Sequence, residues 1–170
     1  MERTSKMKVL FVCHGNICRS PMADYYFKKI VSGAGLSDMI EVQSAATSSE
    51  ELGNPVYPLA KRTLAVHGIG CRDKVAQLLT RRMYDESDYV VGMDQANLKN
   101  IRDMVGANES DEGVKLFKLL DFVKDADGEP LQRDIADPWY TRNFDKAWDD
   151  ISLGCRALLE HIKSSTLCTP

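Results

Sequence analysis

Apolar residues in this chain form short runs that alternate with stretches of helical spacing. Met7 to Cys13 is an almost continuous apolar run, which is typical of a strand buried on both faces of a parallel sheet. We expect a helix from Pro21, because Ser20 is a good N-cap residue and proline is favoured at the first helical position; Gly33 to Gly35 would end it. The chain therefore begins with a strand, a short loop and a helix.

The same alternation continues to the end of the chain. It predicts further strands at 40–45, 88–93 and 114–120 and further helices at 58–67, 94–105 and 144–162. Between the last strand and the last helix, a long charged loop at 124–142 carries two prolines, and loops of that length are commonly functional or mobile. We expect one α/β domain over residues 1–170, a small doubly wound fold. Its four-stranded parallel sheet would have helices on both faces and a ligand site at the carboxyl ends of the strands.

Composition narrows the classes of function. The chain has 22 Lys and Arg against 25 Asp and Glu, a net charge of −3 with a pI near 5.6, so no basic field favours nucleic acid or an anionic membrane. Its apolar runs are far shorter than the roughly 20 residues that span a bilayer. Five cysteines in a chain of this size indicate free thiols rather than a disulfide framework. We expect a cytoplasmic protein, and the three scattered histidines predict no metal or cofactor.

The loop between the first strand and the first helix, residues 13–20, carries the strongest chemical signal. A loop that runs from a strand end into a helix N-terminus can point successive backbone N–H groups at one anion, such as phosphate. Cys13 lies at its entrance, where those groups and Arg19 would stabilise a nucleophilic thiolate. Arg19 offers a planar fork that matches two phosphate oxygens. The pattern indicates a cysteine nucleophile acting on phosphorus.

Such a reaction needs an acid for the leaving oxygen, and Asp137 in the long loop is the best candidate. Pro138 would stiffen the loop, while Trp139 and Tyr140 would form walls for an aromatic ring. The alternative interpretation is an Asp-Pro turn that a half-buried tryptophan anchors.

Together these residues resemble the low-molecular-weight protein tyrosine phosphatases. The similarity covers nearly the whole chain, in Val9 to Ala23, Ser44 to Thr47, Gly53 to Pro55, His67 to Ile69, Asp88 to Tyr89, Met93 to Leu98 and Asp137 to Tyr140. The resemblance implies metal-free hydrolysis of phosphotyrosine through a phosphocysteine intermediate. It also implies phosphotyrosine proteins or small aryl phosphates as substrates, and inorganic phosphate or other oxyanions as inhibitors.

The resemblance also implies roles for single residues. Cys13 would be the nucleophile, Arg19 the phosphate clamp and Asp137 the general acid and base. The remaining phosphate-binding positions are His14, Gly15, Asn16, Ile17, Cys18 and Ser20. Asn16 and Ser20 would brace the loop and donate to the Cys13 sulfur. Ser44 and Asp94 are either outer supports or an ordinary strand-end serine and helix-cap aspartate.

Two loop positions bear on chemistry and substrate choice. Cys18 resembles a second loop cysteine that traps an oxidised nucleophile as a disulfide, or it is a small buried filler. Relatives that act on phosphoarginine carry threonine where this chain has Ile17, whose branched apolar side chain would narrow the pocket in favour of a flat ring. Phosphotyrosine is the expected substrate.

At three places the chain departs from the family pattern, and there the family's residue roles and substrate preference cannot be transferred to this chain. His14 stands where leucine or threonine is commoner and is either a pH-sensitive contact or a spacer. Glu50 occupies a pocket-wall position that is tryptophan in some animal members. Residues 74–78 depart from an expected Ala-Arg-Gln pattern, which puts loop-bracing contacts from that segment in doubt.

Two other classes share this loop. A thioredoxin-coupled arsenate reductase would need further cysteines near the pocket, and Cys71 is the only mid-chain candidate. A non-catalytic phosphoprotein-binding module would keep Arg19 and the backbone cradle but would have no need for Cys13 or Asp137. The retained Asp137 favours hydrolysis over both.

Overall fold

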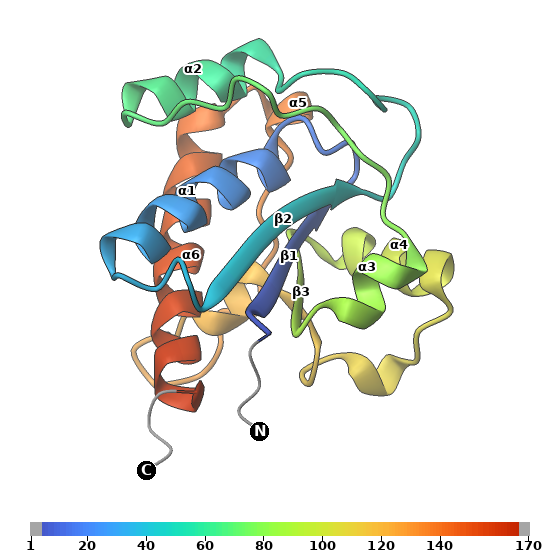
Figure 1. Cartoon of the computed structure of the whole chain (residues 1–170), viewed down its shortest axis with the longest axis vertical. Coiled ribbons are helices and arrows are strands. Elements are labelled where there is room, and N and C mark those ends of the chain that lie inside the picture. Colours follow the sequence, from blue (N-terminus) through green and yellow to red (C-terminus); the bar gives the residue numbers. More distant parts are fainter. Residues whose placement is uncertain (1–4, 167–170) are drawn as a thin grey trace.

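Strand β1 (Met7–Cys13) lies inside a four-stranded parallel sheet with the order β2-β1-β3-β4. We describe residues 5–166 of a computed structural model, shown in Figure 1. The other strands are β2 (Ile40–Ala46), β3 (Tyr89–Gly92) and β4 (Leu116–Lys118). Residues 7–13 pair with 40–46 on one side, and residues 9–12 pair with 89–92 on the other. The predicted parallel α/β sheet is confirmed.

The central strand is buried on both faces. Val9 and Phe11 belong to the core formed with α1 (Arg19–Gly33) and α6 (Phe144–Thr166), whereas Leu10 and Val12 belong to the core on the opposite face. Because side chains alternate between the faces of a strand, both sets must be apolar. This is why residues 9–13 form a continuous apolar run rather than an alternating pattern.

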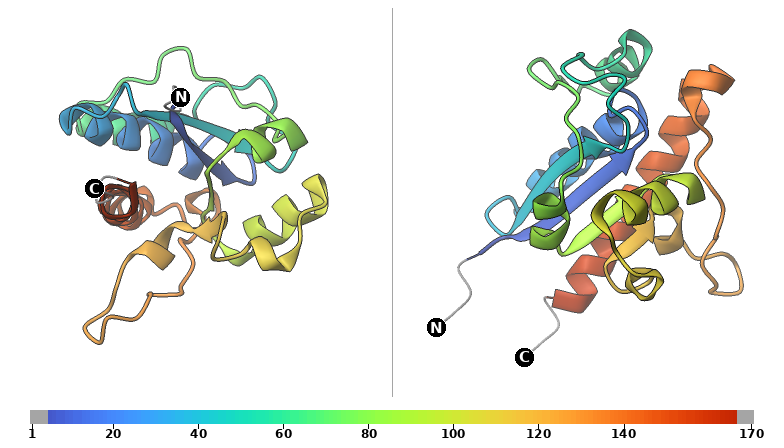
Figure 2. Two further views of the ribbon diagram at one scale, coloured as in Figure 1. Left: turned by 60° about the horizontal axis from the view of Figure 1, so that its bottom comes forward. Right: turned by 90° about the vertical axis from the view of Figure 1, so that its right-hand side faces the viewer.

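Helices cover both faces of the sheet (Figures 1 and 2). On one side α1 and α6 pack against each other and against α2 (Pro58–Val66). On the other side lie α3 (Arg81–Glu86) and α4 (Gln95–Val105), and the short α5 (Pro138–Thr141) precedes α6. Two 3₁₀ turns complete the fold, at Glu109–Asp111 and Leu119–Phe122. The strands that follow β1 in the chain lie on both sides of it, with β2 on one side and β3 and β4 on the other. The direction of the chain across the sheet thus reverses between β1 and β3, and ligands bind at such a point in open α/β sheets.

The predicted start of the first helix is wrong by two residues. Helix α1 begins at Arg19, its N-cap is Cys18, and no side chain caps it. Pro21 is tolerated in the first turn because the N–H groups there have no partner within the helix. Ser20 is buried at the second helical position, where its hydroxyl contacts Cys13 instead of capping the helix.

Other differences lie away from the first loop. The sequence analysis does not predict α3, although Thr80 caps it by accepting from Met83 N at 3.1 Å, and it does not predict α5 inside the loop 124–142. Strand β4 is shorter than expected because Val114 is exposed and residues from Leu119 onward turn into the 3₁₀ helix. Short elements of this kind are stabilised by capping and tertiary contacts more than by periodicity.

The packing of α6 on the turn after β4 gives a first prediction. A Cβ atom built on Gly154 would lie 2.5 Å from Leu119 Cγ, so Gly154→Ala must push α6 outward. We expect a loss of about 1 to 3 kcal/mol in the free energy of unfolding, measured by urea denaturation. Gly33→Ala, at the end of α1 with nothing within 4 Å of the new Cβ, is the control and should not destabilise. Equal stability of the two variants would contradict this close packing.

Candidate active site

The loop at the end of β1 folds around the sulfur of Cys13. Asn16 N and Ser20 N donate to Cys13 Sγ at 3.3 Å and 3.4 Å, and Ser20 Oγ lies 3.0 Å from the same atom. Cys13 is buried, and Ser20 N belongs to the first turn of α1, whose free N–H groups carry the positive end of the helix dipole. Such a set of donors stabilises negative charge on the sulfur.

Asn16 holds this loop in shape. It is 1% exposed and adopts a left-handed backbone conformation with φ of 57°, which asparagine tolerates better than most residues. Its side-chain Nδ2 donates to Ser20 Oγ at 2.8 Å. Since that bond uses a lone pair of the hydroxyl, the hydroxyl hydrogen is free to point at Cys13 Sγ. Asn16 and Ser20 thus contact each other and the Cys13 sulfur, and neither is among the residues that line the pocket.

Residues 74–77, which precede α3, also hold Asn16 in place. Asn16 Oδ1 accepts from Gln77 N at 3.1 Å and from Lys74 Nζ at 3.0 Å. The doubt that the sequence raised about bracing contacts from residues 74–78 is therefore removed, because a backbone N–H and a lysine provide them. Burial lowers the pKa of Lys74, which lies in this partly dry environment.

Ser44 joins this bracing network from the end of β2. Its carbonyl oxygen accepts from Gln77 Nε2 at 2.9 Å and from Lys74 Nζ at 3.3 Å, and its hydroxyl donates to Asp24 at 2.7 Å. Asp24 is buried in α1 and forms an ion pair with Lys28 at 2.8 Å. Sequence reasoning named Ser44, doubted the contacts from Lys74 and Gln77, and missed Asp24. The signal for Asp24 was a charged residue among the apolar buried residues of α1, which does not identify its partner.

Arg19 connects the loop to two distant segments. Its side chain is 3% exposed, and Nη1 donates at 2.7 Å to both Asp94 Oδ2 and the carbonyl oxygen of Ile135. Although burial lowers its pKa, the nearby charges of Cys13, Asp94 and Asp137 raise it above the ordinary value. Asp94 also caps α4 by accepting from Asn97 N at 2.8 Å. It is therefore both a cap and a support for Arg19, the two interpretations that the sequence left open.

Asp137 lies next to Arg19 at the start of α5. Its Oδ1 accepts from Trp139 N at 3.0 Å, and its Oδ2 lies 3.4 Å from Arg19 Nη2. The carboxyl group is only partly buried and lines the same pocket as Cys13. The Asp-Pro segment is thus a helix-capping turn, and the capping holds the carboxyl group at the pocket.

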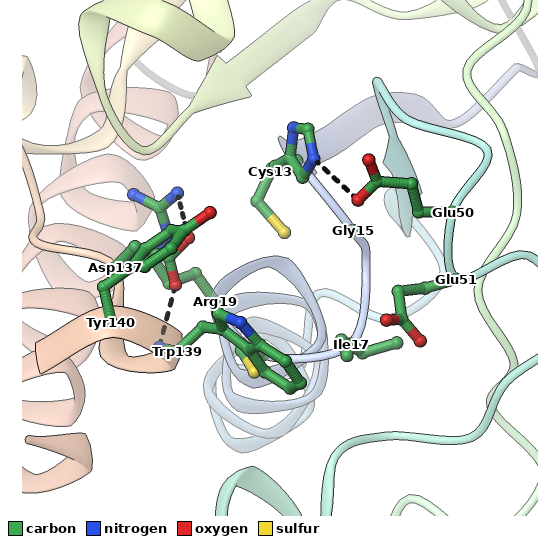
Figure 3. Close-up of a pocket in the computed structure, with 11 residues that line it drawn as sticks. Cys13, Gly15, Ile17, Arg19, Glu50, Glu51, Asp137, Trp139 and Tyr140 are labelled. Carbon is green, nitrogen blue, oxygen red and sulfur yellow. Dashed lines mark hydrogen bonds and ion pairs between the residues drawn. The ribbon is translucent and has the colours of Figure 1, made fainter. Parts of the chain in front are cut away.

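These groups meet in one pocket of about 100 Å³. Figure 3 shows Asp137, Trp139 and Tyr140 on one side of the Cys13 sulfur, with Ile17, Glu50 and Glu51 on the other. The lining residues are Cys13, His14, Gly15, Ile17, Cys18, Arg19, Glu50, Glu51, Asp137, Trp139 and Tyr140. Glu51 was not among the predicted residues. The signal for it was its place beside Glu50 in the wall segment.

At the pocket mouth, His14 and Glu50 face each other. His14 Nε2 lies 3.5 Å from Glu50 Oε2, and both side chains are largely exposed. His14 therefore contacts a titratable partner rather than serving only as a spacer. On the opposite wall, Trp139 packs edge-on against Tyr57 with ring centroids 4.9 Å apart, while Tyr140 is largely exposed.

Cys18 lines the pocket but is 5% exposed. Burial and the charge of Cys13 raise the pKa of Cys18 to about 12, so its thiol is protonated when Cys13 is charged. The disulfide that Cys18 is expected to form with an oxidised Cys13 stays a prediction. Cys71 and Cys155 are also free and buried, and Cys168 lies outside the described residues.

Residues 5–166 contain neither a metal-binding cluster nor a membrane-spanning helix. Within residues 5–166, no group of three or more His, Cys, Asp or Glu side chains is placed to hold a metal ion. None of the helices described is both long and apolar enough to cross a bilayer.

Comparison with known proteins fits this geometry. YfkJ of Bacillus subtilis, named a low molecular weight protein-tyrosine-phosphatase, is 35% identical over 92% of this chain and 96% of its own length. PtpA of Staphylococcus aureus, which bears the same description, is 36% identical over 91% and 92%.

Solved structures agree with the sequence comparison. The crystal structure of YfkJ matches with a TM-score of 0.87 at 34% identity, covering 97% of this chain and 99% of that one. A Drosophila arginine phosphatase matches with a TM-score of 0.79 at 29% identity, covering 92% and 98%. The family model for low molecular weight phosphotyrosine protein phosphatases matches residues 8–167. This chain therefore belongs to the low molecular weight phosphotyrosine protein phosphatase family.

Proposed function

We propose that this chain hydrolyses phosphotyrosine and small aryl phosphates through a phosphocysteine intermediate on Cys13, without a metal ion. The observation that carries the proposal is the convergence of three groups on one pocket. A sulfur ringed by N–H and hydroxyl donors lies beside a buried guanidinium, and a carboxyl group stands above both. Each group matches one requirement of phosphoryl transfer, namely a nucleophile, a clamp for the equatorial oxygens and a proton donor.

The reaction divides into two displacements at phosphorus. In the first, the Cys13 thiolate attacks phosphorus, the bond to the phenolic oxygen breaks, and protonated Asp137 gives its proton to that oxygen. In the second, ionised Asp137 takes a proton from water, and the resulting hydroxide oxygen attacks phosphocysteine. The phosphorus–sulfur bond then breaks, which releases inorganic phosphate and restores the thiolate.

The donors to the sulfur serve both displacements. They stabilise the thiolate before the attack and stabilise it again as the leaving group of the second step. Because Asp94 and the Ile135 carbonyl already hold the Arg19 side chain, this side chain loses little conformational entropy when phosphate binds. Its Nη2, which contacts only Asp137 at 3.4 Å, is the nitrogen placed to meet a phosphate oxygen.

The walls of the pocket favour an aromatic leaving group. Trp139 is 43% exposed, and buried Ile17 stands on the other side of the sulfur. A phenyl ring can pack between these two side chains, and the Ile17 side chain offers no hydrogen bond to the guanidino group of phosphoarginine. Arginine phosphatases share the fold, as the Drosophila structure illustrates, so the wall rather than the fold supports phosphotyrosine.

The competing functions receive less support. An arsenate reductase needs a relay of cysteines, but Cys71 is buried and is not among the residues that line the pocket. A binding module has no use for a buried sulfur that receives three donor contacts, or for a carboxyl group that lines the same pocket. An oxyanion such as inorganic phosphate should still occupy the cradle as an inhibitor.

Replacing the nucleophile should separate binding from turnover. In Cys13→Ser, release of phosphate from an aryl phosphate should fall by on the order of 10⁴-fold or more, because the hydroxyl is a poor nucleophile without an adjacent base. Phosphate should still bind, as measured by calorimetry, because the backbone cradle and Arg19 remain. Cys71→Ser should retain turnover, and a chelator should leave the wild-type rate unchanged. Substantial activity in Cys13→Ser would refute the mechanism.

Arg19→Lys tests the planar clamp while keeping the positive charge. We expect kcat to fall by roughly 10²- to 10³-fold, because an ammonium group cannot contact Asp94, Ile135 and the phosphate oxygens in the same fixed fork. The matched control is Arg156→Lys on α6, an exposed arginine that contacts the Tyr26 hydroxyl. A near-normal kcat in Arg19→Lys would show that charge alone suffices.

Asp137→Asn tests the general acid. Hydrolysis of phenyl phosphate should slow by roughly 10²- to 10⁴-fold, because phenoxide, whose conjugate acid has a pKa of about 10, leaves badly without a proton. The penalty for p-nitrophenyl phosphate should be smaller, so the plot of log kcat against leaving-group pKa should steepen.

Asp134 supplies the control in the same loop. Its carboxylate accepts from Lys118 Nζ and Gln95 N, both at 3.1 Å, which is an anchoring role. Asp134→Asn should leave the slope unchanged. A steeper slope for Asp134→Asn, or equal slopes for wild type and Asp137→Asn, would remove Asp137 from the acid role.

A further inference from the structure

A second groove adjoins the catalytic pocket and is not used by the chemistry above. It shares Ile17, Glu51 and Trp139 with the pocket and continues over the segment before α2 onto the exposed side of that helix. Its other lining residues are Asn54, Pro55, Val56, Tyr57, Pro58, Lys61, Arg62 and Ala65. The two hollows thus have a common wall, and whatever leaves the pocket over that wall enters the groove.

The floor of the groove is rigid and mostly apolar. Tyr57 N donates to the Ile17 carbonyl at 2.9 Å, which fixes the groove directly to the phosphate loop. The Tyr57 ring packs against Trp139 and stacks on Phe144, with centroids 5.9 Å apart. Pro55 forms an isolated bridge with Val75 and is exposed, as is Pro58. A preformed floor of this kind costs little to order on binding.

The far end of the groove is positively charged. Lys61 and Arg62 are exposed in α2, and neither forms an ion pair among residues 5–166, whereas Arg81 and Arg82 in α3 each pair with an acidic residue one turn away. At the near end, the Glu51 carboxylate accepts from Asn54 Nδ2 at 2.6 Å. Lys61 and Arg62 therefore place two positive charges at one end of an apolar groove, in a chain whose net charge is −3.

We propose that this groove docks the segment of a substrate protein that adjoins its phosphotyrosine. An apolar residue of the substrate packs on the floor between Trp139 and Pro58, and an acidic residue beyond it pairs with Lys61 and Arg62. The inference rests on the proposed function, because the phosphotyrosine in the pocket brings the flanking segment to the shared wall. It adds a substrate class, namely phosphotyrosine proteins with an apolar and then an acidic residue on one side of the phosphorylated tyrosine.

The opposite rim of the pocket does not offer such a surface. There, His14 and Glu50 pair with each other across the mouth and are largely exposed. The apolar floor and its two cations adjoin the part of the rim formed by Ile17, Glu51 and Trp139. The two sides of the phosphotyrosine are therefore recognised differently.

The test compares kcat/KM for three substrates. One is a phosphotyrosine peptide with a leucine and two glutamates on one side of the tyrosine. It is prepared in two versions, in which these residues either precede or follow the phosphotyrosine. The second is the same peptide with serine and lysines in place of leucine and glutamates, and the third is p-nitrophenyl phosphate, which is too small to reach the groove. Wild type should prefer the acidic peptide in one orientation, and added salt should reduce this preference.

Three variants probe the groove without touching the pocket lining. Lys61→Glu and Arg62→Glu should each lower kcat/KM for the acidic peptide by about 3- to 10-fold, since reversal replaces an attraction with a repulsion. Ala65→Trp fills the groove and should lower it by at least about threefold. All three should hydrolyse p-nitrophenyl phosphate at the wild-type rate. Lys99→Glu on α4 makes the same change in net charge outside both hollows and should leave the peptide preference intact.

Each outcome decides one proposal. If the variants and wild type show the same ratio of peptide to p-nitrophenyl phosphate hydrolysis, the groove does not dock substrate, although the enzyme remains a phosphatase. If wild type prefers the lysine peptide, the acidic rim at Glu50 governs recognition and the proposal is overturned. If wild type hydrolyses phosphoarginine peptides but no phosphotyrosine peptide, the proposed function itself fails.

Discussion

In the proposed mechanism the sulfur of Cys13 carries negative charge in a buried position, and the contacts of the site meet that constraint. An isolated buried anion is too costly to persist, so it must be surrounded by donors and balanced by a cation. The end of a central strand followed at once by a helix supplies the backbone N–H groups. Ser20 and Arg19, in the first turn of that helix, supply the hydroxyl and the positive charge.

Burying Arg19 creates a second constraint, because its guanidinium also needs partners. Asp94 comes from the N-cap of α4, the Ile135 carbonyl from the long loop, and Asp137 from the start of α5. One arginine thereby connects the phosphate loop to two distant segments, and Asp137 in the second of them lines the pocket. The same ion pair links the proposed general acid to the proposed phosphate clamp.

A third layer holds the loop itself. Asn16 accepts the strain of a left-handed conformation because its side chain bonds in both directions, to Ser20 on one side and to Lys74 and Gln77 on the other. The same loop anchors Tyr57 and so the groove beside the pocket. One short segment therefore positions both the proposed catalytic groups and the proposed docking groove, and its shape depends on contacts from other parts of the fold.

The sequence by itself determined that the sheet is parallel, the succession of most strands and helices along the chain, and the loop that carries Cys13 and Arg19. These features are local, because apolar runs, helix caps and the strand-to-helix turn depend on near neighbours in the chain. Helices α3 and α5 and the true start of α1 escaped prediction, since elements of one or two turns are stabilised by caps and packing rather than by periodicity. Only the tertiary structure decided that Lys74, Gln77 and Asp24 brace the loop, that Glu51 joins the wall, and that the pocket continues into a groove with unpaired cations. Those facts depend on which distant segments meet, and side-chain partners separated by tens of residues leave no periodic trace in a single sequence.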